Sequence, residues 1–205
     1  PGADIWTSRT VSGPLYLMQG QTCKRSTDFG VTFTTVGTAP VAANRAILVG
    51  SEAGAPALYA ALRVGSNYTL YRSSDAGASW ASRAAISDFY GTLHASITNS
   101  NVVHWGGVEA HRSTDGGVSF GIVNAWWQYY DDPLHKLHAD IFGMDSHIYA
   151  GNEVMFYDTD GGTYISNNTG ATVTNISLQN LGISQYYGIQ TSPTNPWLVA
   201  AGAQD

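Results

Sequence analysis

The chain has 205 residues, of which 43% are hydrophobic and only 12% are charged, a balance that favours a folded domain over disorder. Nine Lys and Arg against fifteen Asp and Glu give a net charge of −6, which disfavours nucleic acid and anionic membrane surfaces as partners. No apolar run approaches the ~20 residues that cross a bilayer, so we expect no membrane insertion. Cys23 is the single cysteine, which excludes an internal disulfide.

Short strand-like runs follow one another along the chain, separated by many of its 23 glycines and 7 prolines. They are rich in β-branched and aromatic residues, and no long stretch repeats apolar residues at helical spacing. The sequence therefore predicts an all-β fold in a single domain, with one short helical turn near residues 177–181. The clearest runs lie at residues 46–49, 57–60, 68–73, 147–150 and 197–201.

One motif recurs along the chain: Ser-x-Asp-x-Gly-x-Ser/Thr-aromatic occurs at residues 26–33, 73–80 and 113–120. A degenerate fourth copy at residues 166–173 has Asn168 in place of Asp and Val173 in place of the aromatic residue. An arginine directly precedes the serine of each full copy. A repeat of roughly 45 residues is typical of the four-stranded blades of a β-propeller.

The residue types of the motif suit a hairpin turn. The aspartate can accept hydrogen bonds from backbone N–H groups, glycine can adopt a positive φ, and the aromatic residue can begin the next strand facing the core. We therefore interpret the motif as a folding device rather than a catalytic one. Its structural residues are Asp28, Gly30, Phe33, Asp75, Gly77, Trp80, Asp115, Gly117 and Phe120.

These motifs resemble those of the Asp-box, or BNR-repeat, sialidase-like β-propeller superfamily, and the resemblance covers essentially residues 1–205. Residues 137–140 and 160–166 are most similar to secreted bacterial Asp-box proteins. Xyloglucanase-type glycoside hydrolases and sortilin-type receptors are further members. The resemblance implies about four to five blades of a larger propeller, incomplete at both ends, with residues 197–205 as the first strand of a further blade. It also implies an extracellular or cell-surface location, with the rest of the parent propeller as a partner.

The densest group of polar and aromatic residues lies at residues 126–140 and is predicted to be a loop leading into a strand. Exposed Trp and Tyr rings can stack on sugars, and nearby carboxylates can bind hydroxyl groups, so the loop could contact a glycan or a protein. Alternatively, the two tryptophans pack between blades, which we slightly favour. The candidate ligand-binding residues are Trp126, Trp127, Tyr129, Tyr130, His135, His138 and, from the C-terminal part of the resemblance, Gln204.

Two metal interpretations remain weaker than structural ones. His135, His138 and Asp140 could ligate a transition metal, but His138 and Asp140 would share one face of a strand, so we favour a structural pair and expect no metal. The oxygen-rich segment of Asp158 and Asp160 could bind calcium, although we favour a plain tight turn. We otherwise expect no cofactor.

The sequence disfavours a catalytic function without excluding one. A glycoside hydrolase needs two facing carboxylates, for which Asp131, Asp132, Asp140 and Asp88 are weak candidates. All arginines precede residue 113, so a complete sialidase site is not expected. The preferred function is a binding or scaffold module for a glycan or a protein. The alternatives are a hydrolase resembling the xyloglucanase type and a structural component of an extracellular assembly.

Overall fold

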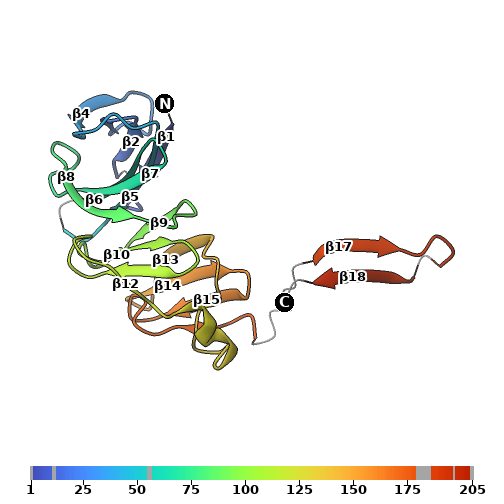
Figure 1. Cartoon of the computed structure of the whole chain (residues 1–205). Coiled ribbons are helices and arrows are strands. Elements are labelled where there is room, and N and C mark those ends of the chain that lie inside the picture. The colour runs from blue at the N-terminus through green and yellow to red at the C-terminus, as the bar shows by residue number, and fades with distance from the viewer. Residues whose placement is uncertain (1, 11–12, 55–56, 179–185, 196, 204–205) are drawn as a thin grey trace.

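The computed structural model describes residues 2–10, 13–54, 57–178, 186–195 and 197–203. In these ranges, four antiparallel sheets contain four strands each, joined in chain order (Figure 1). The predicted all-β fold of four-stranded blades is confirmed. The strands of the first two sheets are β1 (Ala3–Thr7), β2 (Leu15–Gln19), β3 (Thr22–Ser26), β4 (Thr34–Thr38), β5 (Arg45–Ser51), β6 (Ala57–Val64), β7 (Asn67–Ser73) and β8 (Ala81–Ile86).

The remaining strands form two further sheets and a hairpin. The hairpin β17–β18 lies apart from the four sheets in Figure 1. No helix within the described ranges has the length and hydropathy needed to span a bilayer. These strands are β9 (Thr92–Ala95), β10 (Val103–Gly106), β11 (Ala110–Ser113), β12 (Gly121–Ile122), β13 (Gly143–Tyr149), β14 (Asn152–Thr159), β15 (Gly162–Ser166), β16 (Thr174–Asn175), β17 (Tyr186–Thr191) and β18 (Val199–Ala203).

The first strands of successive sheets lie next to one another: β1 contacts β5, β5 contacts β9, and β9 contacts β13. Residues of these four strands and of the segments beside them line a cavity of about 250 Å³. Successive side chains of a strand point to opposite sides, so a sheet between two others must bury both of its faces. β5 accordingly contributes Ala46 and Leu48 to the core shared with the first sheet, whereas Ile47 and Val49 pack against the core shared with the third.

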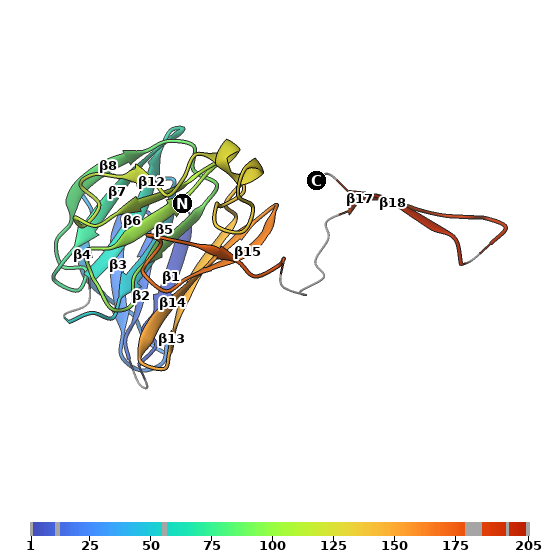
Figure 2. The same ribbon diagram turned by 90° about the horizontal axis from the view of Figure 1, so that it is seen from below.

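The connections between strands alternate between two faces of the molecule, because every sheet is an antiparallel meander. One face, the loop face, carries the β2–β3, β6–β7, β10–β11 and β14–β15 connections and the segments that lead into β5, β9 and β13. The other, the turn face, carries the four recurring motifs together with connections such as β1–β2 and β13–β14. In Figure 2 the β13–β14 end lies at the lower edge of the molecule.

The four recurring motifs form the turns between the third and fourth strands of the four sheets. In the first, Ser26 Oγ donates to Asp28 Oδ1 (2.7 Å) and accepts from the Gly30 N–H (2.9 Å). Asp28 also accepts from the Thr32 N–H (2.9 Å) and hydroxyl (2.5 Å). The same arrangement recurs around Asp75, Asp115 and, through its amide group, Asn168.

These hydrogen bonds favour the ionised carboxylates. Hydrogen bonds from Thr32 and Ser79, the hydroxyls first among them, lower the pKa of Asp28 and Asp75 to about 2. Two successive residues of each turn also have positive φ, as at Phe29 (58°) and Gly30 (85°). This conformation costs a non-glycine residue roughly 1–2 kcal/mol, which explains the glycine of the motif.

The turn glycines also lie at the seams between sheets. A Cβ atom added to Gly77 would lie 2.6 Å from Cys23 Sγ of the preceding sheet, and one added to Gly117 would lie 2.7 Å from Leu70 Cδ2. The arginine before the serine of the third motif contacts the following sheet. Arg112 Nε donates to the carbonyl of Thr169 (2.6 Å), in the turn of the next sheet. The second and third motifs therefore join blades as well as strands.

A buried carboxylate links the third and fourth sheets. Glu153 accepts hydrogen bonds from the hydroxyls of Ser96 (2.5 Å), Thr98 (2.7 Å) and Ser146 (2.8 Å). Burial by itself raises the pKa of Glu153, but the nearby His94 ring and the hydroxyl donors outweigh it and hold the pKa below its ordinary value. The carboxylate thus fixes the β9–β10 connection against β14.

Two local predictions need correction, and a third lies mostly outside the described residues. Residues 126–130, expected to be a loop, form a single 3₁₀ turn, η1 (Trp126–Tyr130). The run at residues 197–205 was expected to begin a blade, but Val199–Ala203 is the second strand of a hairpin, paired with Tyr186–Thr191. Of the helical turn expected at residues 177–181, only Ser177 and Leu178 are described, and they lie in a turn.

Candidate ligand-binding face

The aromatic residues of η1 are exposed on the loop face. The exposed fractions of Trp126, Trp127 and Tyr130 are 41%, 58% and 66%. Their rings meet edge to face, with centroids of Trp126 and Trp127 6.0 Å apart and those of Trp126 and Tyr130 6.2 Å apart. The favoured interpretation, in which the tryptophans pack between blades, is therefore wrong, because η1 projects from the connection between the third and fourth sheets.

Two further candidates from residues 126–140, Tyr129 and His138, are less exposed. Tyr129 is half-buried, and its ring meets that of buried His138 edge to face at 4.6 Å. His138 Nδ1 lies 3.2 Å from the Ala139 carbonyl, and the Gly161 backbone packs against the ring. Residues 137–142 form no strand, so the same-face argument for His138 and Asp140 was wrong.

A second aromatic pair lies on the same face. Tyr90 precedes β9 and Phe142 precedes β13, and their rings stack with centroids 5.8 Å apart and an interplanar angle of 20°. Both rings remain 45% or more exposed. Burial and the neighbouring carboxylate of Asp140 raise the pKa of Tyr90, so its hydroxyl stays protonated.

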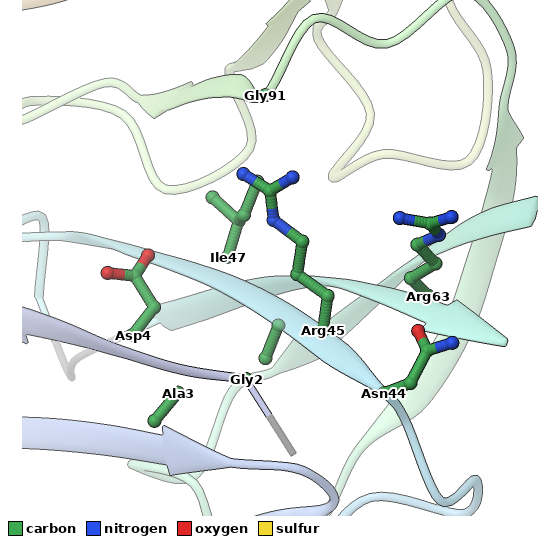
Figure 3. A pocket seen from close by; sticks show the side chains of 9 residues that line it. Gly2, Ala3, Asp4, Asn44, Arg45, Ile47, Arg63 and Gly91 are labelled. Atoms are coloured by element: carbon green, nitrogen blue, oxygen red, sulfur yellow. The ribbon is translucent and has the colours of Figure 1, made fainter. Parts of the chain in front are cut away.

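A pocket of about 660 Å³ opens between the first three sheets on this face (Figure 3). Arg45 begins β5 and Arg63 lies near the end of β6, directly opposite in the strand register. Arg63 Nε donates to the Gly65 carbonyl (2.9 Å), and Arg63 also lies over the Tyr68 ring. Asp4, Asn44, Ile47, Gly91 and neighbouring residues complete the lining.

His135 and Asp132 share a smaller cavity of about 290 Å³ beside β16. His135 Nδ1 lies 3.1 Å from Asp132 Oδ1, and the backbone N–H of His135 donates to the same oxygen (3.1 Å). The two side chains thus fix each other in place. Asp131 is the residue that caps the C-terminal end of η1. This pairing leaves Asp132 engaged with a histidine rather than facing a second carboxylate.

The other acidic candidates serve local structure. Asp88, with φ of 53°, accepts from the Val108 N–H (2.8 Å) through Oδ2. Asp158 accepts from the Thr163 hydroxyl (2.9 Å) beside the β14–β15 turn. Among the described residues, no group of three or more His, Cys, Asp or Glu is arranged to bind a metal. Calcium near Asp158 and Asp160 stays a prediction, and Gln204 lies outside the described residues.

Sequence reasoning missed Arg45, Arg63, Tyr90 and Phe142. Arg45, Tyr90 and Phe142 lie in or beside segments that lead into the first strand of a sheet. Arg63 lies near the end of β6, and none of the four belongs to a recognisable motif. The spacing of the four repeats could have indicated that these segments share one face. The repeat spacing thus indicates which positions share this face, but not which residue types would bind a ligand there.

The turn face is different in character. Its four motif turns satisfy their own polar groups, and an ion pair between Arg9 and Asp145 joins the first sheet to the fourth. The Arg9 N–H also donates to Glu52 Oε1 (2.6 Å), which belongs to the second sheet. These polar groups of the turn face are used within the fold.

No family model and no curated protein matches the sequence. Solved structures do share its architecture. "YCF48 bound to D1 peptide" has a TM-score of 0.52 and 12% identity, covering 97% of this chain and 60% of that one. YCF48 from Cyanidioschyzon merolae has a TM-score of 0.50 and 10% identity, covering 98% and 56%. The chain therefore has a β-propeller fold and spans less than two thirds of the length of either YCF48 chain.

Proposed function

We propose that the protein is an Asp-box-type β-propeller module that binds a segment of another protein on its loop face, outside the cell or at its surface. The observation that carries the proposal is that exposed aromatic rings form contacting clusters, together with a pocket, on one face. Two exposed aromatic clusters and the 660 Å³ pocket lie there. The turn face uses its polar groups internally.

Two further observations support this proposal. The four turns repeat one hydrogen-bond arrangement, which supports the relation to Asp-box proteins. One structural neighbour is a YCF48 protein bound to a D1 peptide, so a propeller of similar fold can bind a peptide. Aromatic side chains are also enriched where proteins bind partners.

A selection from a random peptide display library tests the proposal. Selected peptides should lose binding to a Tyr90→Ala/Trp127→Ala variant, because both rings are exposed on the loop face. A matched Phe29→Ala/Tyr149→Ala variant removes two exposed aromatic residues from the turn face and should retain binding. Peptides that depend on Phe29 and Tyr149 instead, or a selection that yields none, would contradict the proposal.

A glycan is the second candidate ligand, favoured by the exposed rings of Trp126, Trp127 and Tyr130. Sugar rings can stack on such surfaces, and the carboxylate of Asp131 lies next in the chain to accept hydroxyl groups. A glycan-array screen beside a Trp126→Ala/Trp127→Ala variant tests this candidate. Binding that disappears in the variant would support it, and release of reducing sugar from a hit would favour the hydrolase alternative.

A further inference from the structure

The two arginines of the loop-face pocket are an unusual pair. Arg45 and Arg63 are register partners on adjacent antiparallel strands, and Figure 3 shows both guanidinium groups on the same side of the sheet. Like charges directly opposite each other destabilise a strand pair. In the part of the chain that the structure describes, neither arginine forms an ion pair.

The nearby carboxylate of Asp4 is engaged with the backbone. Asp4 Oδ1 accepts from the Ile5 N–H (2.9 Å), and Oδ2 accepts from the Leu48 N–H (2.8 Å). With two guanidinium groups and one carboxylate, the pocket is locally positive although the whole chain has a net charge of −6. Its charge therefore favours an anion.

The two arginines also differ in how they are held. Arg63 is half-buried, and its hydrogen bond to the Gly65 carbonyl and its position over Tyr68 fix the guanidinium group. Arg45 is exposed, and no hydrogen bond fixes its side chain among the residues described. One donor group is thus preorganised, and the other can adjust to a ligand.

We propose that Arg45 and Arg63 bind the carboxylate of an acidic residue in the captured protein segment, an inference that rests on the proposed function. A guanidinium group can donate two parallel hydrogen bonds to a carboxylate. The exposed amide of Asn44 lines the same pocket; its Nδ2 donates one hydrogen to the Gly65 carbonyl (3.4 Å) and can donate the second to a ligand. The carboxylate of Asp4 disfavours a doubly charged phosphate, because it adds a like charge to the lining.

Calorimetric titration with blocked hexaglutamate and hexaglutamine peptides tests the inference directly. Hexaglutamate should bind, whereas hexaglutamine should not. Arg45→Gln and Arg63→Gln should each weaken hexaglutamate binding by about tenfold, the loss of one charge-assisted hydrogen-bond donor. Lys24→Gln removes the same charge outside the pocket and should leave the affinity within about twofold.

Other results would overturn the inference. Equal binding of both peptides, equal weakening by Lys24→Gln, or displacement of hexaglutamate by inorganic phosphate at lower concentration would each exclude a carboxylate site. The result is separable from the proposed function. Selected peptides without acidic residues that ignore Arg45→Gln would overturn this inference alone, whereas hexaglutamate binding at the pocket with an empty peptide selection would overturn the proposed function alone.

Discussion

Replacing Gly77 by alanine tests whether the turn glycines hold neighbouring blades together. Gly77 has φ of 90°, which costs an alanine about 1–2 kcal/mol. The new Cβ would also lie 2.6 Å from Cys23 Sγ and 3.2 Å from Val36 Cγ2, both in the preceding sheet, and such overpacking costs about 1–3 kcal/mol. We expect Gly77→Ala to lower the free energy of unfolding by about 2–5 kcal/mol.

Gly30 provides a matched control at the same position of the first turn. Its φ of 85° is similar, but the nearest atoms to an added Cβ are 3.7 and 3.9 Å away, in ordinary contact. Gly30→Ala should therefore cost only the backbone term, about 1–2 kcal/mol. Urea unfolding followed by circular dichroism measures both variants. The difference between them, about 1–3 kcal/mol, isolates the contact between blades.

A third variant identifies the contact itself. Cys23→Ala removes the sulfur that the new methyl group meets, so it should recover part of the loss in the Gly77→Ala background although it costs stability alone. Equal losses for Gly30→Ala and Gly77→Ala, or no coupling between positions 23 and 77, would refute the argument that the glycine lies at a seam.

Further measurements examine other contacts. Arg112→Gln removes the hydrogen bonds to Thr169 and should lower the free energy of unfolding by about 1–2 kcal/mol; an unchanged urea midpoint would contradict this. Trp127→Ala should change that free energy by less than about 0.5 kcal/mol because the ring is exposed, whereas Trp105→Ala, in the core, should cost about 3–5 kcal/mol. The pKa of Asp28 is about 2 against an ordinary 3.8, so its stabilising effect is complete above about pH 4 and disappears as the pH falls towards 2. A carbon-13 titration of that carboxyl group should give a midpoint near 2, and a midpoint at the ordinary value would show that the turn hydrogen bonds are absent in solution.

The blades could be predicted from the sequence because their turns are local. Ser26, Asp28, Gly30 and Thr32 lie within seven positions of the chain, and their types alone specify the hydrogen bonds that they make. Four copies of such a turn fix the number of complete sheets. The same locality made the exposed rings of residues 126–130 easy to find, although not their orientation.

The binding face could not be predicted, because its contacts join distant segments. Arg45 and Arg63 become opposite only through the register of β5 and β6, and Tyr90 stacks on Phe142 only when the entries into β9 and β13 are adjacent. The strand predicted at residues 197–205 was given the wrong place in its sheet. A single strand has the same sequence pattern whether it is the first or the second of a hairpin.

The contacts between neighbouring repeats affect how such a chain can lengthen by duplication of a repeat. The motif glycines of the second and third repeats contact the repeat before them, and the arginine of the third repeat contacts the repeat after it, where Arg112 meets Thr169. A duplicated repeat would therefore bring both halves of a new junction with it, without any compensating substitution elsewhere. Repeat proteins whose units contact only their neighbours lengthen in this way. Propeller genes built on this turn should tolerate gain or loss of whole repeats more readily than shifts of a few residues within one.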